Sequence, residues 1–310
     1  MRKSVALVLA LAAAAVLTAC GPDTATPGTG TTYTYTYKDQ TITVKAAPQR
    51  IVPLTTPLLN LSFAVGGHPV ARPTTKNPIP DEARSLPELG QTQHIDMEKL
   101  ASLTPDLVLG ETTQNQRLKS LLESSQIPYL FVTYDGIDDN VPLMKFLGEI
   151  YGTQDQAAAA IADYEAKMKA ITEKSAQYPP VRIAILRATG KDVTAETSSS
   201  ICAAMAEALH MTNVVTAHKE LNVSGKTVPY SLEQLAADDP DIIFIVTMGN
   251  RDAISDKLNE EMRSNPAWSQ VKAVRENRVH FLPQDLFLLN PGIRTPEAME
   301  ELLELAHPDA

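Results

Sequence analysis

The chain has 310 residues, with 37 acidic residues against 27 basic ones and a formal net charge of −10. A chain this acidic is a poor candidate for binding nucleic acid, and an anionic ligand would need a local cluster of basic residues. There are two cysteines, Cys20 and Cys202, so we expect no framework of disulfides, and we expect Cys202 to be a small core residue.

The N-terminus reads as an export signal. Arg2 and Lys3 precede the apolar run Val5–Leu17, which is too short to span a bilayer as a stable helix. The run ends in Leu17-Thr18-Ala19-Cys20, which resembles the lipobox of bacterial lipoproteins. In such proteins the chain is cut before the cysteine, and two or three acyl chains anchor it stably. We therefore expect a signal peptide at 1–19, lipidation of Cys20 and a flexible tether at 20–32.

Short apolar runs then alternate with stretches of helical pattern, which is typical of a parallel sheet with helices on both faces. The tyrosine-rich start of this region alternates and predicts a β-hairpin, in which the tyrosines form a strand face rather than a ligand platform. The elements predicted for an N-terminal α/β lobe at 33–140 are a hairpin of Tyr33–Tyr37 and Thr41–Val44, strands at Ile51–Leu54, Val70–Ala71, Asp106–Leu109 and Tyr129–Val132, and helices at Pro57–Val65, Asp96–Ser102 and Leu118–Ser124.

One long helical pattern follows at 141–178. Its apolar residues step by three and four, Pro142 suits a helix start, and Pro179-Pro180 ends the run. A helix of this length would extend roughly 50 Å, with a kink possible near Gly152. We expect it to link two lobes.

A C-terminal α/β lobe at 179–310 is predicted from the next units. Its elements are strands at Arg182–Leu186, Asp241–Val246 and Val279–Leu282, and helices at Ile201–Leu209, Leu232–Ala237, Ile254–Met262 and Pro296–Ala306. MEKLASLTPDLVLG from Met97 and LEQLAADDPDIIFIV from Leu232 both read as helix, Pro-Asp turn and buried strand. The repeat suggests similar lobes with a ligand cleft between them, at the carboxyl ends of the strands.

The order of these features resembles that of one family, the substrate-binding lipoproteins of ABC importers for iron complexes, haem and cobalamin. The features are the lipobox, the strand preceded by Ala47-Pro48-Gln49-Arg50, the paired PDLVLG and PDIIFIV segments and the long helix. The resemblance covers the chain from about Tyr33 onward. It implies the class III periplasmic-binding-protein fold, with two Rossmann-like lobes joined by a rigid helix.

The resemblance also implies a partner and a location. The family docks on its permease through one acidic residue on each lobe, and the matching positions are Glu88 and Glu233. The alternative is two ordinary carboxylates near helix starts, but docking is favoured because both fall at equivalent places in the two halves. We expect a monomer, lipid-anchored outside the cytoplasm, that serves an ABC permease and its ATPase, binds no nucleic acid and has no intrinsic cofactor.

The ligand is expected to be an iron complex, with haem favoured. The haem-binding branch of the family uses a Met of the first lobe and a His of the second, whereas this chain has His94 and Met248 near those places, so the two ligand types look exchanged. His and Met are a known pair of axial ligands to haem iron. Alternatively, His94 leads into a helix and Met248 is an apolar wall residue.

Further cleft residues are predicted from their position after strands. Arginines there would suit carboxylates such as haem propionates. The expected ligand-binding residues, besides His94 and Met248, are Thr55, Thr56, Arg72, Thr74, Thr75, Gln93, Tyr134, Arg187, Arg251 and Phe287, with Gln284 and Asn290 near Phe287 on the far wall.

Other functions remain open. A ferric siderophore or cobalamin would use the same cleft with different polar groups. A metal-dependent α/β enzyme is the alternative from another class, but the chain has no HExxH, GxSxG, CxxC or GxGxxG motif, so we expect no enzyme. A receptor for free zinc or manganese would need more histidines than the six present.

Overall fold

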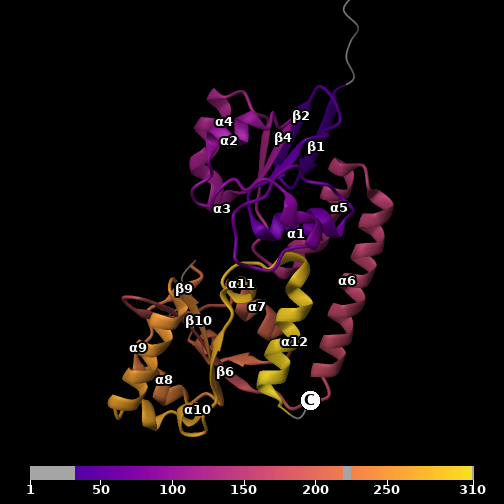
Figure 1. Ribbon diagram of the computed structural model, residues 1–310. Helices are drawn as coiled ribbons and strands as arrows, with labels where there is room; N and C mark the ends of the chain where they lie inside the picture. The colour runs from indigo at the N-terminus through magenta and orange to yellow at the C-terminus, as the bar shows by residue number, and fades with distance from the viewer. Residues whose placement is uncertain (1–31, 219–224, 309–310) are drawn as a thin grey trace, which may run out of the picture. The chain divides into compact units, whose positions relative to one another are not determined.

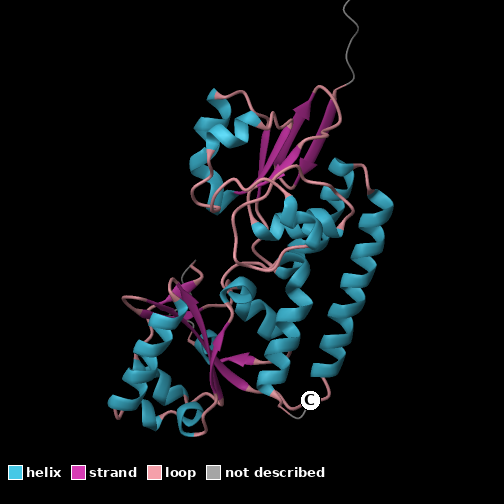
Figure 2. Cartoon of the chain, in the orientation of Figure 1, coloured by secondary structure: helices cyan, strands magenta, loops and turns pink. Residues whose placement is uncertain are grey.

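The computed structural model describes residues 32–218 and 225–308. The predicted signal peptide, Cys20 and nearly all of the predicted tether lie outside the described residues. Residues 32–310 form one compact unit by their contacts. This unit contains two groups of strands with helices packed around each, and we name these the first and the second lobe (Figures 1 and 2).

The first lobe is built on a parallel sheet of order β3-β4-β5. Alternate residues of each strand face opposite sides, and both sides are buried, as expected for a parallel sheet covered by helices. The elements of this lobe are the hairpin β1 Tyr33–Tyr37 and β2 Gln40–Val44, the strands β3 Ile51–Pro53, β4 Leu107–Glu111 and β5 Tyr129–Val132, and the helices α1 Thr56–Ala64, α2 Met97–Ser102, α3 Thr112–Asn115, α4 Lys119–Ser124 and α5 Asn140–Tyr151.

The prediction of a strand at Val70–Ala71 is wrong. Val70 and Ala71 belong to no strand, and the next residue, Arg72, forms an isolated parallel bridge with Glu88. Pro73 has no backbone N–H to donate, and the backbone hydrogen bonds between these segments resume at Thr74 N, which lies 2.8 Å from Gly90 O.

The long linking helix is also not one helix. The predicted run forms α5 and then α6 Gln154–Ser175, separated at Gly152 and Thr153. Gly152 has φ of +69°, the left-handed conformation that often ends a helix. α5 belongs to the first core, whereas α6 packs against the first core through Ile161 and Tyr164 and against the second through Ile171. The helix that connects the two lobes is therefore α6 (Figure 1).

The second lobe has a mixed sheet of order β11-β10-β6-β7-β9, in which β8 pairs with β6. β6, β8, β10 and β11 pair in parallel, and β7 is antiparallel to both neighbours. Its elements are β6 Arg182–Thr189, β7 Val193–Glu196, α7 Ile201–Ala208, β8 Thr212–Asn213, β9 Thr227–Val228, α8 Leu232–Asp238, β10 Ile242–Met248, α9 Arg251–Ser264, α10 Lys272–Arg275, β11 Val279–Leu282, α11 Gln284–Phe287 and α12 Thr295–Ala306. The strands β7, β8 and β9 were not predicted.

Buried polar contacts hold the lobes together beside α6. Asn140 Nδ2 at the start of α5 lies 2.9 Å from Tyr164 Oη on α6 and 2.9 Å from Thr295 Oγ1 on α12. Asn290 Nδ2 donates to the carbonyl oxygens of Tyr134 at 3.1 Å and Gly136 at 2.8 Å. These bonds connect the first lobe to the last fifth of the chain and fix one side of the space between the lobes.

Cys202 is fully buried in the second core, as expected, and burial raises the pKa of its thiol. Within the described residues, no helix is both long and apolar enough to cross a membrane.

Candidate functional site

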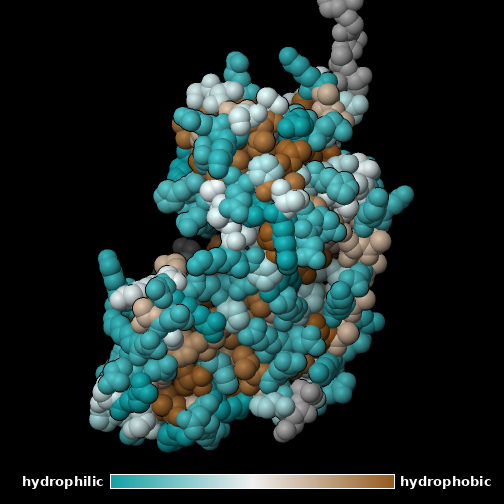
Figure 3. Space-filling model, viewed as in Figure 1, coloured by the Kyte–Doolittle hydropathy of each residue, from teal (hydrophilic) through white to brown (hydrophobic). Residues whose placement is uncertain are grey.

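A cavity of about 850 Å³ lies between the lobes. Its first-lobe residues follow the strands directly: Thr55 and Thr56 follow β3, Glu111 ends β4, and Tyr134 follows β5. Gly249, just after β10, contributes from the second lobe. The cavity therefore sits at the carboxyl ends of both sheets, where α/β proteins generally bind ligands. Figure 3 shows a recess between the lobes whose visible rim is mainly hydrophilic.

The first-lobe wall presents mainly hydroxyl and amide groups. Thr55 caps α1 by accepting a bond from Leu58 N, and its Oγ1 lies 3.4 Å from Tyr134 Oη. Burial raises the pKa of Tyr134, so this phenol stays protonated and can donate a hydrogen bond. Glu111 caps α3, accepting from Thr113 N at 3.0 Å and Gln114 N at 2.8 Å. Its carboxylate is thus occupied by the protein.

The second-lobe wall combines two amides with an apolar surface. Gln284 Nε2 donates to Thr247 Oγ1 at 2.8 Å and to Gly249 O at 2.9 Å, which fixes the loop after β10. Asn290 is held by its two carbonyl bonds to the first lobe. Leu288 and Leu289 line the cavity between these amides, and Leu289 is 43% exposed. This wall suits the apolar face of a ligand.

Most charges at the cavity are paired. Asp135 accepts from Lys226 Nζ at 2.6 Å, and Asp285 accepts from Arg294 Nη1 at 2.6 Å. Lys76 lines the cavity, is exposed and forms no ion pair with any other residue that the structure describes. It is therefore the basic side chain best placed to meet an anionic group of a ligand.

Six of the predicted binding residues line the cavity: Thr55, Thr56, Thr74, Thr75, Gln93 and Tyr134. Gln284 and Asn290 line its far wall, whereas Phe287 is fully buried in the second core and does not reach the cavity surface.

The three predicted arginines do not line the cavity, because each is engaged by the protein. Arg72 Nη2 lies 2.6 Å from Glu88 Oε1, and Arg187 Nη2 lies 2.7 Å from Glu196 Oε1. Arg251 Nη2 donates to Phe281 O at 2.8 Å. The expected clamp of arginines for ligand carboxylates is thus not assembled in this structure.

Neither His94 nor Met248 lines the cavity. Each is next in sequence to a lining residue, Gln93 in the first lobe and Gly249 in the second. His94 is exposed, and Met248, the last residue of β10, is 49% exposed. No group of three or more His, Cys, Asp or Glu side chains with metal-site geometry occurs within the described residues.

The two predicted docking carboxylates have different surroundings. The carboxylate of Glu88 accepts hydrogen bonds from Arg72 and from Thr74 Oγ1, the latter at 2.8 Å. The bond from Thr74 has the larger effect, and both bonds lower the pKa of Glu88. Glu233 lies in the first turn of α8, where hydrogen bonds from its own backbone N–H and from Ser231 lower its pKa. Both side chains are therefore ionised at neutral pH.

Several lining residues were missed by the sequence prediction. Glu111, Thr113 and Gln114 follow β4 just as Thr55 follows β3, so the rule about carboxyl ends of strands would have found them. Gly249, which follows β10, would have been found by the same rule. The remaining missed residues have no comparable signal; they are Pro57 in α1, Asp285 in α11, and Lys76, Asn77, Gln91, Thr92, Asp135, Leu288 and Leu289 outside the helices and strands.

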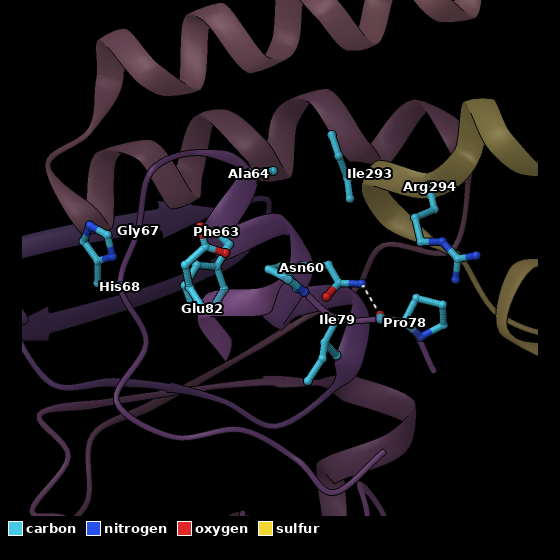
Figure 4. A pocket seen from close by; sticks show the side chains of 11 residues that line it. Asn60, Phe63, Ala64, Gly67, His68, Pro78, Ile79, Glu82, Ile293 and Arg294 are labelled. Atoms are coloured by element: carbon cyan, nitrogen blue, oxygen red, sulfur yellow. Dashed lines mark hydrogen bonds between the residues drawn. The ribbon is translucent and has the colours of Figure 1, made fainter. Parts of the chain in front are cut away.

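A second cavity of about 480 Å³ lies on another side of α1 (Figure 4). Phe63, Ile79 and Ile293 give it a mainly apolar lining, and Asn60 donates to Pro78 O at its wall. It lacks the ring of strand ends and the concentration of polar side chains that surround the larger cavity, which is the better candidate for a binding site.

Comparison with known proteins identifies the family. A family model described as "Periplasmic binding protein" matches residues 51–286. The chain belongs to this family. These binding proteins act outside the cytoplasm. The match includes parts of both lobes and all residues that line the larger cavity except Leu288, Leu289 and Asn290.

Individual relatives are distant in sequence but similar along their whole length. The high-affinity heme uptake system protein IsdE of Staphylococcus aureus (strain MRSA252) is 23% identical over 268 residues, covering 86% of this chain and 90% of the relative. The structure of S. aureus IsdE complexed with heme aligns with a TM-score of 0.72 and 22% identity, over 83% of this chain and 98% of that one.

Two further solved structures share the fold of this periplasmic binding protein. An ABC transporter substrate-binding protein from Listeria monocytogenes EGD-e aligns with a TM-score of 0.75 and 22% identity, over 85% of this chain and all of that one. S. aureus SirA complexed with staphyloferrin B aligns with a TM-score of 0.70 and 20% identity, over 89% of this chain and 98% of that one. The predicted α/β fold of two lobes is therefore confirmed.

Proposed function

We propose that this protein is the substrate-binding component of an ABC importer, which captures an iron complex in the cavity between its lobes and delivers it to a membrane permease. The observation that carries the proposal is the cavity of about 850 Å³ at the carboxyl ends of both sheets, in a chain of the periplasmic binding protein family. Of the relatives named above, IsdE is described as a heme uptake protein and SirA as complexed with staphyloferrin B. The chain itself performs binding and no chemical step.

Haem is the favoured ligand. The relative IsdE is a haem uptake protein, and the second-lobe wall offers the apolar surface of Leu288 and Leu289. Lys76 supplies a positive charge for a propionate. His94 and Met248 are the proposed axial ligands of the iron, and their side chains would have to turn into the cavity when haem binds.

A ferric siderophore is the main alternative, because the first-lobe wall is rich in hydroxyl and amide groups and SirA has the same fold. Cobalamin would use the same walls without axial protein ligands.

Docking and anchoring complete the proposal. Glu88 and Glu233, one on each lobe, would pair with arginines of the permease. Such pairing affects mainly the orientation and the rate of association of the two proteins.

Cys20 would carry the lipid that holds the protein at the outer face of the cell membrane. Replacing Cys20 by Ala should release the protein from the membrane fraction; retention of the variant there would contradict the anchor.

The deciding experiment is an absorbance titration of the chain from Gly21 onward with haemin, followed by ferrioxamine B and hydroxocobalamin. We expect a saturable Soret shift with haemin that changes in His94→Ala and Met248→Ala. His68→Ala is the matched control, because His68 is exposed on the first lobe but lines the smaller cavity. Binding of the siderophore or cobalamin alone would replace haem as the ligand. Binding of none of the three would overturn the proposed function.

A further inference from the structure

The smaller cavity is formed by three segments that are far apart in the sequence. Residues 63–64 come from α1, residues 78–80 form a second side, and residues 293–294 come from the turn that precedes α12. Figure 4 shows side chains of all three segments around one space. Pro78 and Pro80 restrict the backbone of the second side, so this wall is stiff. The volume of about 480 Å³ is within the range of small-molecule sites.

Asn60 places an unsatisfied hydrogen-bond acceptor at the wall of this cavity. The residue is only 8% exposed, and its Nδ2 donates to the carbonyl oxygen of Pro78 at 3.1 Å. Its Oδ1 is buried and has no hydrogen-bond partner among the residues that the structure describes. Buried polar atoms are nearly always paired, because leaving one unpaired costs stability. The unpaired oxygen therefore indicates a donor that the protein itself does not supply.

The charges around the cavity favour a cation. Arg294 is engaged by two carboxylates, with its Nη1 2.6 Å from Asp285 Oδ2 and its Nη2 2.6 Å from Glu297 Oε1. Glu82 also lines the cavity, is exposed and forms no ion pair with any other residue that the structure describes. Of these four groups three are negative and one is positive. An anionic ligand would be repelled, whereas a cation could pair with Glu82.

Most of the remaining lining is apolar. Phe63, Ile79 and Ile293 can cover the hydrocarbon part of a ligand, and the ring of Phe63 would attract a cation that lies over its face. A primary ammonium group carries three hydrogen-bond donors and a positive charge. A small molecule that joins such a group to an apolar body therefore matches the apolar lining, the unpaired carboxylate of Glu82 and the unpaired oxygen of Asn60.

We propose that the smaller cavity is a second binding site, which takes a small primary amine with an apolar body. The apolar body would lie among Phe63, Ile79 and Ile293, and the ammonium group would pair with Glu82 and donate to Asn60 Oδ1. A turn of the Asn60 side chain would bring this oxygen to the ligand, and side-chain adjustments are common on binding. The site is independent of the proposed function, because the two cavities share no lining residue.

The test compares two probes of nearly the same shape, phenethylamine and phenethyl alcohol. They are titrated into the chain from Gly21 onward at about pH 8, where the amine is charged and an ordinary histidine is neutral. The NMR signals of the δ1 methyl groups of Ile79 and Ile293 report binding at this cavity. We expect saturable shifts of both signals, and an affinity about twofold to fivefold higher for the amine than for the alcohol, the scale of an exposed ion pair.

Two variants test the proposed contacts. Glu82→Gln should remove the preference for the amine and leave the affinity for the alcohol unchanged. Glu98→Gln is the matched control, because Glu98 is an exposed first-lobe glutamate that lines neither cavity, and it should keep the preference. Asn60→Leu removes the acceptor and should weaken binding of both probes, because both carry a donor.

A third variant tests the location. Ala64→Phe would fill the cavity from α1 and should abolish the binding of both probes, with a urea midpoint close to that of the parent. Absence of saturable shifts with the amine in the parent would overturn the inference. Equal affinities for the two probes, or a preference that survives in Glu82→Gln, would overturn it as well. These results do not depend on whether the larger cavity binds haemin, so they leave the proposed function to its own test.

Discussion

Lys226 of the second lobe forms an ion pair with Asp135 of the first lobe, with 2.6 Å between Nζ and Oδ1. Asp135 lines the larger cavity, and both side chains are partly exposed. The pair thus links the two lobes by charge at the cavity wall that contains Asp135, in addition to the buried amide bonds of Asn290. Its solvent exposure makes it the part of the lobe contact that is most sensitive to salt.

Replacing Lys226 by Met should speed ligand dissociation. Exposed ion pairs are worth about 0.2–1 kcal/mol, so we expect an increase of at most about fivefold at low salt. The difference from the parent should shrink as sodium chloride is raised, because salt screens the pair in the parent. Stopped-flow dissociation of haemin at several salt concentrations measures this effect. Lys257→Met, which changes a second-lobe lysine away from the larger cavity, is the control, and an identical salt response in both variants would refute the role of Lys226.

Replacing Arg187 by Met should destabilise the second lobe strongly. Glu196 is fully buried, and its pKa is raised because burial outweighs the attraction of Arg187. Without Arg187 the carboxylate would be buried and unpaired, which typically costs about 3–5 kcal/mol. Urea unfolding at pH 7.5 should report this loss, and Arg187→Met/Glu196→Gln should recover part of it.

The same variant should be less impaired in acid. A carboxyl group with a raised folded pKa favours folding while it is protonated, and this advantage is lost as pH rises from its unfolded pKa toward its folded one. Arg187→Met should therefore lie closer to the parent at pH 4.5 than at pH 7.5. A pH-independent difference would mean that Arg187 acts through packing rather than charge.

Gly148 should tolerate no side chain. It lies in α5 where α5 packs on α6, and a Cβ there would lie 2.5 Å from Ala157 Cβ. Overpacking of this kind costs about 1–3 kcal/mol, so Gly148→Ala should lower the urea midpoint. Gly190→Ala is the matched control, because a Cβ at Gly190 meets no atom within 4 Å. Equal midpoints for the two variants would contradict the tight contact between the helices.

Acid should weaken the protein partly through Asp241. Burial alone would raise its pKa, but hydrogen bonds from Lys272 and the Arg182 backbone outweigh burial and lower the pKa below its ordinary value of 3.8. This group therefore stabilises the fold above its unfolded pKa, and the contribution disappears as pH falls through its lower folded pKa. Urea midpoints should drop below about pH 4, and less steeply in Asp241→Asn than in the parent. If the urea midpoints of Asp241→Asn fell with pH as steeply as those of the parent, Asp241 would not be a source of the acid sensitivity.

The strands and helices with clear periodicity were predictable because burial imposes it. Ile51–Pro53 and residues 242–246 are buried on both faces, and such strand segments form continuous apolar runs in the sequence. The threonines that follow β3 line the cavity because parallel strands direct their carboxyl ends to one edge. The break between α5 and α6 was harder to place, because apolar spacing continues on both sides of Gly152.

The direction of long charged side chains was not predictable in the same way. Arg187 lies inside β6 rather than at its end, and Arg72 forms an isolated bridge instead of following a strand, and each side chain turns to a carboxylate brought close by the fold. Glu88 is sixteen residues from Arg72, and Glu196 is contributed by β7, an unpredicted strand. Position along a strand thus predicts which side chains are near the cavity, but the partner of a charged group depends on pairings that spacing does not reveal.

The order of the cavity residues along the chain also bears on how the protein matures. One wall begins at Thr55, and the opposite wall is not complete until Asn290. α1 packs on the turn Gly292–Arg294, and α6 packs on α12 near the C-terminus. Long separations of this kind make the final structure slow to form relative to local helices. A chain emerging from a translocation pore would therefore have no ligand cavity until its last helix had emerged, so premature capture of a ligand by a partly exported chain is prevented by topology alone.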